Sequence, residues 1–276
     1  MKKILVPIDF SDEAKKACKV AASLAKKTDS EIILLHMLDI PGTTVDPMDS
    51  GNTSGGAQTI FFMKAIKKKI SDFKKFDFFN GIKISDTVLF KKAFEGVIEE
   101  SINQHVDLIV MGSQGATGLR EMLVGSNTEK VVRHSRIPVL VIKQDIDNYD
   151  IKNLVFASDF KEESKGSFVN VIDFAKIFDA HIHLLYINTI SNFEPTVKSQ
   201  MRLDSFVADF NFDNYSKHIY NDTTIEEGIL SYGRKINADA IAINTHGRSG
   251  LSQLFNESIS KELANHALLP VITFKI

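Results

Sequence analysis

The chain has 276 residues, which is long for one domain and comfortable for two of about 140 residues each. Hydrophobic residues make up 43% and charged residues 25%, as in an ordinary globular protein. The net charge of −2 predicts no general attraction to nucleic acid or to an anionic membrane surface, so we expect neither as a partner.

Cysteine content and the character of the first residues favour a cytoplasmic protein. Cys18 is the single cysteine, so no internal disulfide framework forms, as expected in a reducing compartment. The sequence after Met1 runs straight into a strand without the apolar region of a signal peptide. Apolar runs stay well short of the roughly 20 residues that span a bilayer. Cys18 itself lies on the apolar stripe of the first expected helix, where we expect it to be buried and inert.

Alternating apolar runs and amphipathic segments predict strands and helices in turn. The first strand, 3–8, leads into a helix that Ser11 can cap, with Asp12 and Glu13 favourable in its first turn. A second strand, 32–38, precedes a segment rich in Gly, Ser and Thr, 41–58, that we expect to be a loop. The remaining elements are a helix over 59–76, a strand over 83–90, a helix over 96–105, a strand over 108–111, a helix over 127–134 and a strand over 139–142. Such continuous apolar strands between helices predict a doubly wound parallel α/β sheet.

The chain repeats itself at domain length. Residues 3–10 and 153–160 are both apolar strands that end in Asp-Phe, and this offset of 150 also aligns 29–35 with 179–185. Further on the offset becomes 132, which matches Glu95-Gly96 with Glu227-Gly228 and Pro138-Val139 with Pro270-Val271. The repeat predicts two tandem Rossmann-like domains, 1–144 and 151–276, each with a five-stranded parallel sheet.

Ligands of open α/β sheets bind at the carboxyl ends of the strands, where the strand order reverses. Asp9 follows the first strand and Gly112 follows the fourth, so both face one crevice if these strands are neighbours. Gly112 and Gly115 permit close approach of the backbone to a ligand. Gly125 and Ser126 then precede a helix whose free N–H groups and dipole favour a phosphate.

This glycine pattern, Gly-x2-Gly-x9-Gly-Ser, resembles the nucleotide motif of ATP-binding universal stress proteins. The opening Val6–Ser11 and the ending Arg133–Val141 resemble the same family. The resemblance implies an ATP-binding stress-response protein whose last strands, 139–142 and 271–274, pair antiparallel to form an intramolecular pseudo-dimer. It also implies three groups of ligand residues. They are Pro7, Ile8, Asp9 and Met37 at the nucleoside, Met111, Gly112, Gln114 and Gly115 at the ribose and phosphates, and Gly125, Ser126, Asn127 and Thr128 at the phosphates, with Mg²⁺ or Mn²⁺.

The second copy departs from this motif. Gly112 aligns with Asn244, Gly125 with Glu257, Asn127 with Ile259 and Pro7 with Ala157. Glu257 would place a carboxylate where a phosphate should bind, and Asn244 would add bulk beside the ligand. We therefore expect a degenerate second site that does not take ATP as the first does, with a different ligand left open.

Other candidate sites are weaker. The chain lacks Gly-x4-Gly-Lys-[Ser/Thr], and Ser54–Ala57 resembles the loop of ATP pyrophosphatases only faintly, so we interpret it as a flexible connection. His181 and His183 lie on one face of a strand without an obvious third ligand, so we expect packing and not metal binding.

No nucleophile or general base can be assigned, which favours a nucleotide-dependent binding or regulatory module with an unidentified protein partner. A slow ATPase or phosphotransferase, a ligand-free structural module and further assembly into a homodimer remain open.

Overall fold

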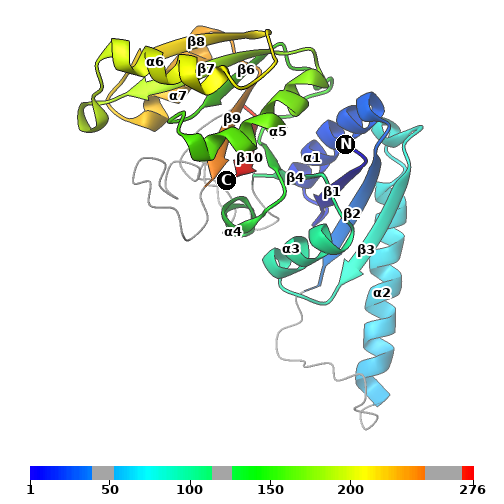
Figure 1. Ribbon diagram of the computed structural model, residues 1–276. Helices are drawn as coiled ribbons and strands as arrows, with labels where there is room; N and C mark the ends of the chain where they lie inside the picture. Colours follow the sequence, from blue (N-terminus) through cyan, green and yellow to red (C-terminus); the bar gives the residue numbers. More distant parts are fainter. Residues whose placement is uncertain (39–52, 114–125, 246–268) are drawn as a thin grey trace.

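The computed structural model describes residues 1–38, 53–113, 126–245 and 269–276 (Figure 1). In the first half lie β1 (Lys3–Pro7), α1 (Asp12–Thr28), β2 (Glu31–Met37), α2 (Thr53–Phe73), β3 (Ile84–Leu89), α3 (Ala93–Asn103), β4 (Leu108–Gly112), α4 (Ser126–His134) and β5 (Val139–Ile142). In the second half lie β6 (Asn153–Ala157), α5 (Lys165–Lys176), β7 (His181–Asn188), α6 (Thr196–Val207), β8 (Tyr215–Asn221), α7 (Ile225–Lys235), β9 (Ala240–Thr245) and β10 (Val271–Lys275). Short 3₁₀ helices η1 (Asp77–Phe79), η2 (Glu162–Ser164) and η3 (Ile190–Asn192) complete the described elements.

The ten strands in the described part of the chain form one sheet in the order β3-β2-β1-β4-β5-β10-β9-β6-β7-β8. Neighbours are parallel except β5 and β10, which pair antiparallel through Val141 and Val271, Leu140 and Ile272, and Val139 and Thr273. Each half thus contributes five parallel strands, and the two fifth strands join the halves. The expected fold and the expected pairing of the last strands are both confirmed, whereas the domain limits 1–144 and 151–276 stay a prediction.

Helix α1 forms as its sequence predicts. The side chain of Ser11 accepts a hydrogen bond from the backbone N–H of Ala14 at 3.2 Å, and Asp12 and Glu13 occupy the first turn. Its apolar face is buried, and Cys18 is fully buried within it, where desolvation raises the pKa of the thiol far above its ordinary value. This confirms the expectation of a packed thiol, and the raised pKa supports the prediction that it is unreactive.

One hydrophobic cluster runs along one face of the sheet through both halves. It includes side chains of α1 and α5 together with Leu140 of β5 and Ile272 of β10. On the opposite face each half has its own cluster, built on β4 and α3 in the first half and on β9 and α7 in the second. The halves therefore share a core as well as a sheet.

The segment that joins the halves is bound to α1. Lys19 forms ion pairs with Asp145 at 2.7 Å and with Asp147 at 3.0 Å, and Lys27 pairs with Asp150 at 3.1 Å. Tyr149 is 2% exposed and packs edge-on against Phe178, with ring centroids 5.6 Å apart. The connection thus runs along the surface of α1 and is anchored in the core by Tyr149.

The expected loop over 41–58 is wrong in its last part, because α2 begins at Thr53. Ser54–Ala57, interpreted as a flexible connection, lies inside this helix. Two adjacent glycines cost a helix about 1 kcal/mol each, but extending an existing helix is favourable, and a long run of good helix formers follows. Residues 41–52 lie outside the described residues. Among the described helices, none combines the length and apolar character that crossing a membrane requires.

Candidate functional site

The strand order of the first half reverses between β1 and β4. These strands are parallel neighbours, with Ile4 opposite Leu108 and Leu5 opposite Ile109. Asp9 follows β1 and Gly112 ends β4. Since neighbouring parallel strands end on the same side of a sheet, both residues lie at its carboxyl end, where the strand order reverses. The hypothesis that these two strands are neighbours is confirmed.

Asp9 lies in a tight turn between β1 and α1. Its Oδ1 accepts hydrogen bonds from the backbone N–H of Ser11 at 3.0 Å and from the Ser11 hydroxyl at 2.5 Å. Phe10 has a φ of 64°, a left-handed conformation that costs an ordinary residue about 1–2 kcal/mol. Its ring packs on buried His36, 4.8 Å between centroids, and the Nδ1 of His36 lies 2.8 Å from the carbonyl oxygen of Ile8. The Asp9 carboxylate is therefore fixed and exposed at the strand end.

Gly112 is required by its contact with the first turn of α1. A Cβ atom on Gly112 would lie 2.7 Å from the carbonyl oxygen of Glu13 and 2.9 Å from the Cβ of Glu13. Contacts this short do not occur between real side chains and backbone. The glycine therefore lets the start of α1 pack directly on the end of β4, which brings the Asp9 turn beside Gly112.

Helix α4 begins at Ser126 and is tied to the end of β4. The hydroxyl of Thr128, a 5% exposed residue, donates a hydrogen bond to the carbonyl oxygen of Gly112 at 3.0 Å. Ser126 and Asn127 are exposed in the first turn of the helix. The expected phosphate residues at 112 and at 126–128 are thus joined by a direct contact between Thr128 and Gly112.

The other expected ligand residues differ in their accessibility. Ile8 and Met111 are buried in the clusters on opposite faces of the sheet. Met37, at the end of β2, packs against Gly96 of α3. A Cβ atom on Gly96 would lie 3.0 Å from the Cγ of Met37. Pro7 ends β1 and is partly exposed. Gln114, Gly115 and Gly125 lie outside the described residues.

In the second half, Asn244 of β9 occupies the position equivalent to Gly112. It is 4% exposed, its Oδ1 accepts a hydrogen bond from the Ser167 hydroxyl at 2.9 Å, and its Nδ2 is buried without a hydrogen-bond partner. The regular helix α5 begins only at Lys165, after the 3₁₀ turn η2. The helix of the second half therefore starts later than α1, and the asparagine side chain lies beside it.

Asp159, the equivalent of Asp9, is 3% exposed and pairs with Lys161 at 3.1 Å. Arg202 of α6 donates to the backbone carbonyl of Asp159 at 3.2 Å and to buried Glu194 at 2.6 Å. A partly buried ion-pair network thus covers this strand end, whereas Asp9 is exposed.

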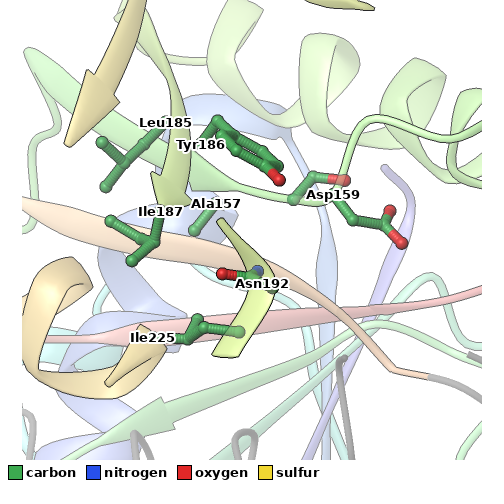
Figure 2. Close-up of a pocket in the computed structure, with 8 residues that line it drawn as sticks. Ala157, Asp159, Leu185, Tyr186, Ile187, Asn192 and Ile225 are labelled. Carbon is green, nitrogen blue, oxygen red and sulfur yellow. The ribbon is translucent and has the colours of Figure 1, made fainter. Parts of the chain in front are cut away.

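A small cavity lies at the ends of β6 and β7. It is lined by Ala157, Ser158, Asp159, Leu185, Tyr186, Ile187, Asn192 and Ile225. Figure 2 shows Ile187, Ala157, Asn192 and Ile225 facing one another across it, while the Asp159 carboxylate turns away. About 10 Å³ is open to the centre of a water molecule, which is room for about one water and not for a nucleoside.

Sequence analysis missed four groups that shape these sites. The backbone of Glu13 contacts Gly112, and the ring of His36 contacts the carbonyl of Ile8; neither contact can be predicted from residue type. Arg202 reaches the carbonyl of Asp159 only because α6 folds over the end of β6. The left-handed conformation of Phe10 could have been suspected from the sequence, because Asp-Phe recurs at 159–160. Phe160 also has a positive φ, of 53°. Within the described ranges, no group of three His, Cys, Asp or Glu side chains is arranged to hold a metal ion.

Comparison with known proteins gives consistent matches. The model of the universal stress protein family matches residues 1–143 and 216–275. A universal stress protein of Methanocaldococcus jannaschii is 32% identical over 154 residues, which cover 52% of this chain and 95% of that relative. One from Bacillus subtilis is 33% identical over 156 residues, covering 51% and 98%.

The fold has a solved counterpart that matches over nearly the whole of both chains. The crystal structure of a universal stress protein from Archaeoglobus fulgidus matches with a TM-score of 0.72 at 20% identity. The match covers 99% of this chain and 96% of that one, so the two-half architecture as a whole has a precedent.

Proposed function

The chain belongs to the universal stress protein family, and we propose that its first half binds one ATP, with Mg²⁺ or Mn²⁺ held through the phosphates. The observation that carries this proposal is the contact between Thr128 and Gly112, which fixes the N-terminus of α4 at the sheet end where β1 and β4 diverge. A ligand bound there would touch both the Asp9 turn and the first turn of α4.

The first turn of α4 supports the phosphate part of this proposal. The first N–H groups of a helix have no partner within the helix, and the helix dipole adds positive potential there. Ser126 and Asn127 are exposed at this end and offer a hydroxyl and an amide as further donors. Together they form a suitable site for a phosphate chain.

Asp9 supports the nucleoside part. Its Oδ1 is oriented by two hydrogen bonds from Ser11, so the carboxylate is held in place before any ligand arrives. A fixed, exposed carboxylate at the end of a first strand suits the hydroxyl donors of a ribose. Pro7 and Met37, at the ends of β1 and β2, would border the base.

We propose that the second half does not bind ATP in the equivalent place. Asn244 replaces the glycine, and a cavity with room for about one water replaces the nucleoside site. The ion pairs of Asp159 and Arg202 would have to break before a nucleotide could enter, at the cost of burying charges without partners.

The protein would act in the cytoplasm as a nucleotide-dependent binding or regulatory module, with occupancy of the first half altering the surface that it offers to a protein partner. A ligand changes that surface only to the extent that it binds one conformation better than another.

Two measurements test the proposal. Freshly purified protein is denatured and the released small molecules are identified by mass, and stripped protein is titrated calorimetrically with ATP and Mg²⁺. We expect ATP in the released fraction and a stoichiometry of one ATP per chain. Release of free phosphate from ATP is followed in parallel, since steady turnover would assign the same site to a slow ATPase. Absence of heat and of bound nucleotide would contradict the proposal.

A further inference from the structure

Three histidines of the second half surround one serine hydroxyl. His181 and His183 lie on β7, and His218 lies on the outer strand β8. The Oγ of Ser216 lies 2.9 Å from Nε2 of His181, 2.7 Å from Nε2 of His218 and 3.3 Å from Nδ1 of His183. Nδ1 of His183 and Nε2 of His218 are 3.4 Å apart. His218 is the third imidazole that sequence analysis did not find, because only the pairing of β7 with β8 brings it close.

The hydrogen-bond partners of these rings show which nitrogen carries the hydrogen in His181 and in His183. Each of two rings has an outer nitrogen that faces away from Ser216. In His181 it is Nδ1, 2.9 Å from Oδ1 of Asn214, and in His183 it is Nε2, 3.1 Å from Oδ1 of Asn153. An amide oxygen only accepts, so these outer nitrogens carry the hydrogen and the inner nitrogens of neutral rings carry lone pairs. The Ser216 hydroxyl can donate its proton to Nε2 of His181, and Nε2 of His218, when it carries the hydrogen, can donate to Nδ1 of His183. The neutral cluster is then fully hydrogen-bonded, with no free lone pair among these inner nitrogens to take up another proton.

The surroundings oppose a positive charge on the cluster. Burial and the neighbouring rings of His181 and His218 lower the pKa of His183 to about 4. Burial, His181 and Lys235 lower the pKa of His218. Helix α7 also contributes Tyr232, whose ring lies 5.1 Å from that of His218 and whose pKa burial raises to about 12, so it stays neutral. The adjacent strand β6 contributes the uncharged Asn153.

The first half has the same geometry without these imidazoles. Ile33 pairs with Ser85 as His183 pairs with Ser216, so Ile33 and Thr87 occupy the positions of His183 and His218. Ile33 is buried in an apolar cluster there. The two halves of one chain thus offer a matched comparison between a sheet with this histidine cluster and a sheet without it.

We propose that the histidine cluster is a proton-sensitive switch that keeps β8 and α7 packed on β7 at neutral pH and loosens them in weak acid, while the first half keeps its structure. Uptake of a proton by His183 or His218 would place an imidazolium among two further imidazoles, and on His218 the charge of Lys235 would oppose it as well. Opening β8 and α7 would hydrate that charge, so the open state takes up the proton more readily than the closed one.

The direction of the pH effect follows from this difference. The pKa of His183 in the closed state lies below the ordinary histidine value of about 6.5 that it has when opened. Its contribution to stability is therefore complete above about pH 6.5 and is lost as the pH falls from there toward 4.

Amide hydrogen exchange on the full chain at pH 7.5, 6.0 and 4.5, corrected for intrinsic rates, tests the switch. Between pH 7.5 and 4.5 we expect the protection of peptides from β8 and α7 to fall at least about tenfold more than that of peptides from β3 and α3. Equal loss in both halves would overturn the proposal.

Matched variants and a direct titration complete the test. His183→Ile with His218→Thr installs the first half's residues and should abolish the difference between the halves. His105→Asn, at an exposed histidine with a φ of 53° that asparagine tolerates, should preserve it. In case the double variant folds poorly at pH 7.5, the histidine side chains of the unmodified protein are titrated by NMR. There His183 should titrate below free histidine, and an ordinary midpoint for both His183 and His218 would refute the switch.

Discussion

The hydroxyl of Thr128 donates to the carbonyl oxygen of Gly112, and this bond joins the first turn of α4 to the last residue of β4. The glycine is itself pressed against the backbone of Glu13. One residue therefore holds the N-termini of both α1 and α4 at the same sheet end. Two helix N-termini at one sheet end favour an anion there.

Replacement of Gly112 by alanine should distort this arrangement. The added Cβ would meet the carbonyl of Glu13 at 2.7 Å, so α1 must shift, and we expect a loss of about 1–3 kcal/mol in the free energy of unfolding together with weaker ATP binding. Chemical denaturation and calorimetry measure the two effects. Gly166→Ala is the control, because nothing lies within 4 Å of its Cβ position, and it should leave stability equal or higher.

Thr128→Val removes the hydroxyl and keeps the shape of the side chain, so it tests the hydrogen bond alone. The partly buried carbonyl of Gly112 would lose a donor, at a cost of about 1 kcal/mol, and the freed end of α4 should lower ATP affinity by about tenfold. Thr128→Ser keeps the hydroxyl and should restore both values toward those of the unmodified protein. If valine and serine bind ATP equally well, the contact does not position the phosphate site.

The matched aspartates test whether one half alone binds nucleotide. Asp9→Asn should reduce ATP affinity by about 10- to 100-fold, the range expected when a charged hydrogen-bond acceptor is lost. Asp159→Asn should leave affinity and stoichiometry unchanged while lowering stability, because the buried Asp159 pairs with Lys161. Calorimetric titration of both variants decides the matter, and a change in stoichiometry caused by Asp159→Asn would point to a second working site.

Tyr149 offers a stabilising substitution. Its hydroxyl is buried without a hydrogen-bond partner, and burial raises the pKa of that hydroxyl well above its ordinary value. Tyr149→Phe removes an unsatisfied polar group and retains the ring contact with Phe178, so stability should rise by about 1 kcal/mol. Tyr149→Ala, which removes the ring as well, should cost about 3–5 kcal/mol. A lower melting temperature for the phenylalanine variant would show that the hydroxyl has a stabilising role.

Sequence signals were sufficient for the fold of each half, whereas the pairing of the two last strands was expected from the family resemblance. Apolar strands alternating with amphipathic helices, the Ser11 cap and the repeat of Asp-Phe at offset 150 predict elements that the structure confirms. The start of α2 was missed because glycines at 55 and 56 resemble loop sequence, although a helix can extend through them.

Contacts between distant segments could not be predicted from residue type. The role of Gly112 in ligand approach stays a prediction, and its close contact with Glu13, 99 positions earlier in the numbering, was not foreseen. The Arg202 network and His218 depend in the same way on α6 and β8 reaching their final places. Contacts between residues close in sequence can be predicted from a local motif, whereas contacts between residues far apart in sequence cannot.

The antiparallel join of β5 and β10 also has an evolutionary consequence. When two identical subunits assemble about a two-fold axis, every substitution appears twice, and a change that harms one copy harms both. Covalent fusion removes that constraint. Glycine at 112 and asparagine at 244, or isoleucine at 33 and histidine at 183, can then coexist in one molecule, so that one copy keeps an inherited task while the other is free to acquire a new one.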